Sequence, residues 1–118
     1  MESPDGQWVY YYGWREISRV ATAGGEEEEV FEPGRRVPWG TLKPVGNRLY
    51  FMGWDFRERV MLISSYDLLA KEAREAFRLS QAEFERGASF DVSPDGKYVI
   101  FPRTDGAETN LVLLESFR

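Results

Sequence analysis

A short repeated turn organises the whole chain. SPDGQWVYY at residues 3–11 recurs as SPDGKYVIF at 93–101, and a degenerate copy, KPVGNRLYF, stands at 43–51. In each copy proline fixes φ at about −65° and the glycine two residues later can adopt positive φ, so each tetrapeptide predicts a tight reversal. The aspartates can accept hydrogen bonds from nearby backbone amides and stiffen the turn. The predicted turn residues are Pro4, Asp5 and Gly6, then Pro44 and Gly46, then Pro94, Asp95 and Gly96.

An aromatic and apolar run follows each turn. The runs 8–12, 49–52 and 98–101 are nearly continuous in apolar residues, which is typical of strands covered on both faces. A second strand is expected after a polar turn in each copy, at 16–22, 59–65 and 110–116, and an outer strand near 28–32. Four Trp, six Tyr and eight Phe in 118 residues agree with strands, because flat side chains pack well on a pleated surface.

The spacing of the copies indicates the fold. They begin 40 and 50 residues apart, which brackets the size of one four-stranded blade of a β-propeller. We therefore predict an all-β fold, a single β-propeller fragment over 1–118 with about two and a half four-stranded antiparallel blades. The approximate blades are 1–34, 35–86 and 87–118. The first blade is expected to lack its innermost strand and the last its outermost.

Residues 67–85 are compatible with two structures. Apolar residues, among them Leu68, Leu69, Ala73 and Phe77, recur there at helical spacing between good helix formers. The repeat instead requires a turn near 70–73 and an outer strand near 75–80. The prediction follows the repeat, because tertiary context overrides intrinsic propensity at the rim of a sheet.

The SPDG turns, the aromatic strands after them and the segment ISRVATAGGE at 17–26 resemble the TolB-like, WD40-like β-propeller repeat of bacterial proteins. The segment TNLVLLESFR at 109–118 is similar to the last blade of propellers attached to winged-helix transcriptional regulators and some Ser/Thr kinases. The resemblance covers essentially the whole chain and departs from the pattern at Lys43 and Val45. It implies a non-catalytic disc for protein or ligand interaction, related to the sensor region of a bacterial regulator.

Composition narrows the chemistry. The chain contains no Cys and no His, which removes thiolate zinc sites, Cys nucleophiles and His-based acid–base catalysis. We therefore predict no enzyme activity, no catalytic residue and no cofactor. The net charge of −5 without a basic stripe argues against nucleic-acid binding. No apolar run approaches the roughly 20 residues of a membrane span and no signal peptide is recognisable in this segment. The chain is therefore expected to be soluble and cytoplasmic as expressed, while the natural compartment is left open and a longer parent protein could be periplasmic.

The number of blades predicts a partner. A chain with so few blades is too short to close a propeller ring by itself. Its uncovered blade faces and unpaired strand edges are surfaces to which other strands or proteins bind. The prediction is a homo-oligomer in which copies of this chain complete the ring, with another protein or a small ligand as a further partner. The alternative function is the substrate-gating propeller of a prolyl-oligopeptidase or tricorn-like peptidase without its hydrolase domain.

Loop aromatics supply the candidate ligand site. Trp14 and Trp54 each follow a glycine at matching positions after a strand, where the loops of a blade begin. With Arg15 and Arg57 they are the candidates for a ligand-binding loop face, and the competing interpretation is packing of the blade seams. The acidic run 26–29 is interpreted as a solvated turn and outer strand. No metal site is predicted, because the Asp-Gly pairs match turns and their spacing matches no EF-hand.

Overall fold

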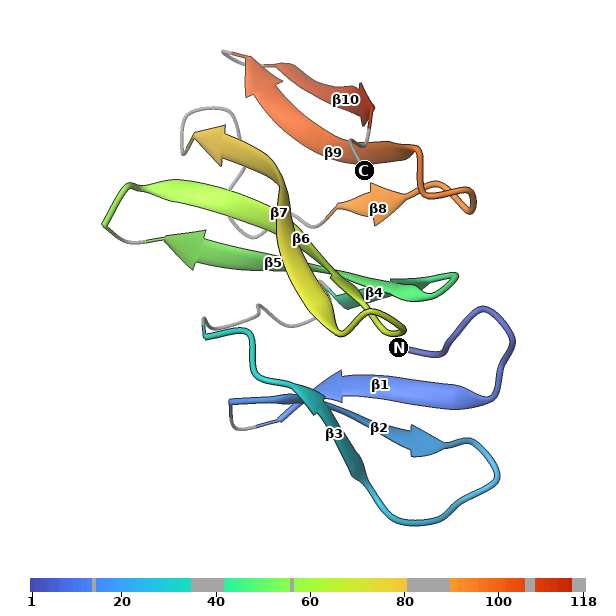
Figure 1. Ribbon diagram of the computed structural model, residues 1–118. Coiled ribbons are helices and arrows are strands. Elements are labelled where there is room, and N and C mark those ends of the chain that lie inside the picture. The colour runs from blue at the N-terminus through green and yellow to red at the C-terminus, as the bar shows by residue number, and fades with distance from the viewer. Residues whose placement is uncertain (14, 35–41, 56, 81–89, 106–107, 116–118) are drawn as a thin grey trace.

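The part of the chain that the structure describes forms ten strands (Figure 1). The computed structural model describes all residues except 14, 35–41, 56, 81–89, 106–107 and 116–118. The described residues contain no helix, and thus none long and apolar enough to cross a membrane. The strands are β1 (Trp8–Tyr12), β2 (Ile17–Ala21), β3 (Glu28–Phe31), β4 (Leu42–Val45), β5 (Arg48–Asp55), β6 (Val60–Asp67), β7 (Glu72–Ser80), β8 (Asp91–Val92), β9 (Tyr98–Asp105) and β10 (Glu108–Glu115).

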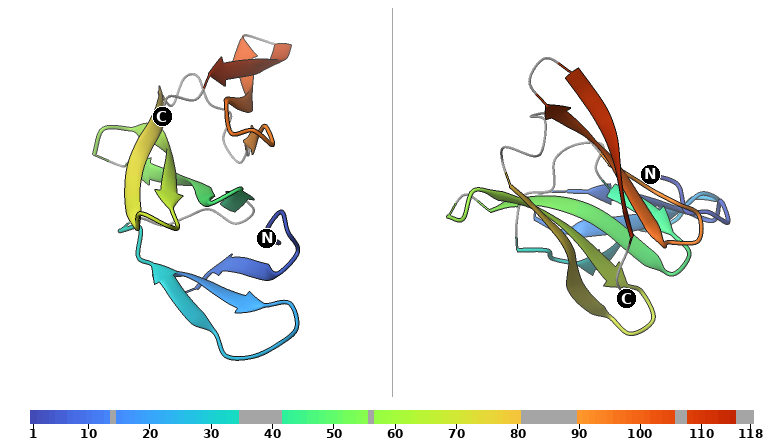
Figure 2. Two further views of the ribbon diagram at one scale, coloured as in Figure 1. Left: turned by 45° about the vertical axis from the view of Figure 1, so that its right-hand side comes forward. Right: turned by 90° about the horizontal axis from the view of Figure 1, so that it is seen from above.

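The strands form three antiparallel sheets in chain order. Blade 1 is β1-β2-β3, blade 2 is β4-β5-β6-β7, and blade 3 is β8-β9-β10. Each blade is a meander in which every strand pairs with the next in sequence, and the blades stack face to face with blade 2 in the middle (Figures 1 and 2). The prediction of an all-β propeller fragment is thereby confirmed, and the three sheets lie inside the predicted blade ranges.

Blade 1 has an inner edge that the sequence did not predict. The Met1 amino group donates to Tyr10 O at 2.5 Å, Tyr10 N–H donates to Met1 O at 2.7 Å, and Ser3 N–H donates to Trp8 O at 2.7 Å. A single antiparallel bridge joins Glu2 to Val9. Residues 1–3 thus lie along the inner edge of β1 through these bonds, while blade 1 has three strands and no fourth, inner strand, as the sequence predicts. Three residues are too short to carry a strand pattern.

The segment that could have been helical forms β7. Asp67 Oδ1 accepts the N–H groups of Leu69 at 2.9 Å and Ala70 at 3.0 Å, and Lys71 N–H donates to Asp67 O at 2.8 Å. A single helical turn therefore starts, but Lys71 has a φ of 57°, and a left-handed residue ends a helix. β7 then pairs with β6 along its length. The ladder and the core beneath it outweigh the helix propensity. Residues 81–85 of the ambiguous stretch lie outside the described residues.

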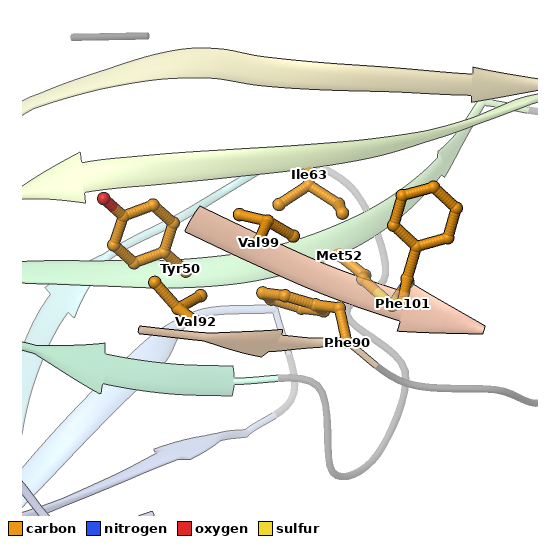
Figure 3. Packing of buried hydrophobic residues seen from close by; sticks show 7 residues of the cluster. All are labelled: Tyr50, Met52, Ile63, Phe90, Val92, Val99 and Phe101. Atoms are coloured by element: carbon orange, nitrogen blue, oxygen red, sulfur yellow. The ribbon is translucent and has the colours of Figure 1, made fainter. Parts of the chain in front are cut away.

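Two hydrophobic clusters fill the two seams between blades. Because successive side chains of a strand point to opposite faces, Leu49 and Phe51 of β5 face blade 1 while Tyr50 and Met52 face blade 3. The seam between blades 1 and 2 buries Tyr10, Ile17, Leu42, Leu49, Phe51 and Tyr66. The seam between blades 2 and 3 buries Tyr50, Met52, Ile63, Phe90, Val92, Val99 and Phe101 (Figure 3). This double coverage explains why the apolar runs do not alternate with polar residues.

Candidate functional site

The first and third repeated turns share one hydrogen-bond pattern. Asp5 Oδ1 accepts the Ser3 hydroxyl at 2.6 Å and the Gln7 N–H at 3.0 Å, and Ser3 Oγ accepts the Trp8 N–H at 3.0 Å. The third turn repeats these bonds at 2.6, 3.0 and 3.0 Å, with Ser93, Asp95, Lys97 and Tyr98 in the corresponding places. The turns close on Gly6, Gly46 and Gly96, whose φ values are 71°, 57° and 72°. Glycine is the residue that adopts this region without steric cost.

Hydrogen bonding lowers the pKa of both turn aspartates below the ordinary 3.8. For Asp5 the strongest contribution is the Ser3 hydroxyl, followed by the Gln7 N–H, and for Asp95 it is the Ser93 hydroxyl, followed by the Lys97 N–H. A pKa lower in the folded than in the unfolded chain stabilises the fold above about pH 4, and this stabilisation is lost as the pH falls through the folded pKa. Ionised carboxylates therefore hold these turns at neutral pH.

A hollow of about 430 Å³ lies where the turns of blades 2 and 3 meet. The β4–β5 and β6–β7 turns of blade 2 form one wall and the β8–β9 turn of blade 3 forms the other. Across the seam the Tyr50 hydroxyl donates to Gly96 O at 3.5 Å. The side chains that give the hollow its chemistry are Asn47, Arg48, Asp67, Leu69, Pro94 and Asp95.

Arg48 is the cationic group of the hollow. Its Nη2 lies 3.6 Å from Asp67 Oδ2, and its Nη1 donates to Ser65 Oγ at 3.4 Å. The pKa of Asp67 is lowered first by the N–H groups of Ala70 and Leu69, and then by the charge of Arg48. The hollow therefore contains a half-buried guanidinium that is paired with Asp67 and shares the lining with a second carboxylate, Asp95.

The residues proposed from the sequence do not line this hollow. Trp54 is half-buried in β5 opposite Met61. Arg57 is exposed in the β5–β6 turn, where its N–H donates to Asp55 Oδ1 at 3.0 Å. Arg15 is exposed in the β1–β2 turn. These positions lie at the end of the blades opposite to the repeated turns, and Trp14 lies outside the described residues.

The hollow itself could have been found from the repeat. Turns at matching positions of stacked blades must lie side by side, so Asn47 and Arg48 of the middle copy had to come near the Pro94–Gly96 turn of the next. Seeing this requires the stacking order, because the two segments are far apart in sequence. The repeated turns were interpreted only as structural elements, and their shared hollow was missed.

The acidic run borders the outer strand of blade 1. All four glutamates of 26–29 are exposed. Glu28 binds Arg19 through Oε1 and Nη2 at 3.1 Å, and the Arg19 guanidinium lies 3.9 Å from the centre of the Trp8 ring. The described residues include no cluster of three or more Asp, Glu, His or Cys able to hold a metal ion.

Blade 3 exposes an apolar face on the side away from blade 2. Along β9, Val99 and Phe101 are buried in the seam, whereas Tyr98 and Ile100 retain 39% and 37% of their surface. In the repeat, Ile100 matches Tyr10 of blade 1 and Tyr50 of blade 2, both only 2% exposed. We call Tyr98 and Ile100, with their strand β9, the C-terminal open face.

Blade 1 presents the complementary side of the stack. Val9 and Tyr11 of β1 point away from blade 2, and Val20 of β2 pairs with Val9 on the same face. Val9 and Tyr11 match buried residues in the other copies, Leu49 and Phe51 in blade 2 and Val99 and Phe101 in blade 3. Here all three side chains are only half-buried. We call Val9, Tyr11 and Val20 the N-terminal open face.

The architecture has a counterpart among solved structures. It is similar to the crystal structure of a putative 6-phosphogluconolactonase from Bacteroides fragilis. The TM-score is 0.54 at 15% sequence identity, and the match covers 98% of this chain and 36% of that chain. This chain therefore spans about a third of the length of that protein. No protein-family model matches the chain, and no curated protein matches it. The likeness establishes the fold: this chain is a fragment-sized set of blades from a propeller-like architecture.

Two expectations from the sequence are corrected by this similarity. The resemblance to the TolB-like, WD40-like repeat is wrong, since no family model matches and the structural similarity is to a protein named for a different family. The regulator role that depended on that resemblance loses its basis. The expectation that the chain has no enzyme activity is also overturned, because the same fold occurs in a protein named as an enzyme. The absence of Cys and His excludes thiolate and imidazole chemistry. The turns of a propeller can still position carboxylate and guanidinium groups for catalysis.

Proposed function

We propose that this chain is an assembly module that completes a β-propeller by binding further blades through its open faces. The observation that carries the proposal is the exposure of Ile100, at a repeat position that is buried in both internal seams. Burying apolar surface at a third seam of the same kind would be favourable by about 25 cal/mol per Å². A ring as long as the similar structure would take about three lengths of this chain, since the match covers 36% of that structure.

The mass in solution tests this proposal. The chain has a mass of 13.7 kDa, and size-exclusion chromatography with light scattering over a range of concentrations is expected to give an integral multiple of that mass. Far-UV circular dichroism on the same fractions checks that they are folded β protein. A folded species that stays at 13.7 kDa up to millimolar concentration would refute the proposal.

A second candidate function is the lactonase activity in the name of the similar structure. The specific observation in its favour is the half-buried Arg48 in the hollow between blades 2 and 3, because a guanidinium can bind the phosphate of a phosphorylated sugar. Hydrolysis of 6-phosphogluconolactone by the assembled protein tests this candidate. Activity that is lost in Arg48→Met and retained in Arg57→Met would support it. No hydrolysis above the spontaneous rate would discard it.

A further inference from the structure

We infer that the partner at the C-terminal open face is a second copy of this chain, bound head to tail through its N-terminal open face. This inference rests on the proposed assembly function and specifies its interface. The open face of blade 3 would then meet blade 1 of the next copy, and the same contact would repeat around a ring.

The internal seams define which faces pair. Between blades 1 and 2, the face containing Tyr10 packs against the face containing Leu49 and Phe51. Between blades 2 and 3, the face containing Tyr50 packs against the face containing Val99 and Phe101. Both seams thus join the same two repeat positions in the same order.

Continuing this order by one blade selects the partner. Ile100 of blade 3 occupies the repeat position of Tyr10 and Tyr50. The face that covers Ile100 should therefore carry residues at the repeat positions of Leu49 and Phe51. In this chain the residues of that kind that are only half-buried are Val9 and Tyr11 of blade 1. A symmetric contact between two C-terminal open faces would instead join two faces that are never paired with each other in the described seams.

Charge at the turns agrees with the same order. In the seam between blades 2 and 3, Arg48 of one blade and Asp95 of the next line a common hollow. In the proposed seam between copies, the turn that contains Lys97 of blade 3 would lie beside the turn that contains Asp5 of the next copy, and both residues are exposed in the single chain. Lys97 stands next to Tyr98, which is the repeat counterpart of Arg48. A cation of one copy would then lie near a turn aspartate of the next. Such a pair favours the correct register more than it adds affinity.

Blocking each face separately tests the head-to-tail order. Ile100→Glu places a charge on the C-terminal open face, and Val20→Arg places one on the N-terminal open face. We expect both variants to be folded monomers of 13.7 kDa. An equimolar mixture is expected to form a dimer of twice that mass, because each variant keeps the face that the other lacks. Leu69→Glu, at a turn residue that is 76% exposed and outside both faces, is the control and should assemble like the wild type.

The outcomes separate the inference from the proposed function. If the wild type assembles but Val20→Arg alone still forms a dimer, the two C-terminal open faces pair with each other and the inference is overturned. It is equally overturned if the folded variants stay monomeric when mixed. If the wild type is itself a monomer, the proposed function fails first. Val9→Arg, which charges the same face from β1, replaces Val20→Arg should the latter fail to give the circular dichroism of the folded wild type.

Discussion

Replacing Leu49 with alanine tests whether the seams hold this stack together. Leu49 is fully buried between blades 1 and 2. The substitution removes three buried carbon groups, which corresponds to about 2.4 kcal/mol of transfer free energy. The cavity left between two facing sheets adds to this, so the total loss in the free energy of unfolding should be about 3–4 kcal/mol. For a small domain this is a large part of the total stability.

The chain supplies a matched control for this substitution. Leu69 is 76% exposed at the tip of the β6–β7 turn, so Leu69→Ala should cost less than about 0.6 kcal/mol. Urea denaturation followed by tryptophan fluorescence measures both losses at one fixed protein concentration, since the proposed assembly would make stability depend on concentration. The m-value should stay constant for both variants. Equal losses in the two variants would refute the packing described for the seam between blades 1 and 2.

Four further predictions concern single residues. Asp95→Asn should flatten the loss of stability that the wild type shows below about pH 4, because the amide cannot titrate; acid titration followed by circular dichroism measures this. Gly46→Ala should lower the free energy of unfolding by about 1 kcal/mol through backbone strain alone, since no atom lies within 4 Å of an added Cβ. Phe31→Leu should lower the free energy of unfolding by about 1 kcal/mol beyond the effect of its smaller buried area, because the Phe31 and Tyr66 rings are stacked with their centres 4.0 Å apart. Urea denaturation measures the loss for Gly46→Ala and for Phe31→Leu. Glu2→Leu should lower the protein concentration at which the proposed assembly begins, because it removes a charge from the edge of the N-terminal open face. Glu2→Gln, which keeps a polar side chain there, should lower it less; light scattering over a concentration series measures both.

The fold could be predicted from the sequence at the positions that belong to the repeat. The proline and glycine positions locate the turns, and the apolar runs after them locate β1, β5 and β9, because turn geometry and burial on both faces leave strong local patterns. The turn that follows Asp67 shows where local helix propensity no longer decides the structure. Its carboxylate starts a helical turn, yet the pairing of β7 with β6 decides the outcome, and that pairing is not visible in the local sequence.

The candidate site was harder to predict because it is formed between blades. Arg48 and Asp95 are 47 residues apart and meet at one hollow only after blades 2 and 3 stack. The tryptophan and arginine candidates rest on glycine–tryptophan pairs at matching positions after a strand, where the loops of a blade begin, but Trp54 and Arg57 lie at the far end of the blade from that hollow. Matching positions of successive copies would have been the better guide, since stacking brings equivalent turns together.

Glu2 marks where the proposed seam between copies would differ from the seams within the chain. In blades 2 and 3 the matching position is held by Leu42 and Val92, both buried against the preceding blade. In blade 1 the Glu2 carboxylate folds back instead toward the Gly6 turn, where its Oε1 would lie 3.1 Å from an added Cβ. The inner edge of the N-terminal open face is therefore polar while its middle, at Val9 and Val20, is apolar. In the proposed assembly, a surface of this kind would leave an apolar centre for blade 3 of the preceding copy inside a polar edge.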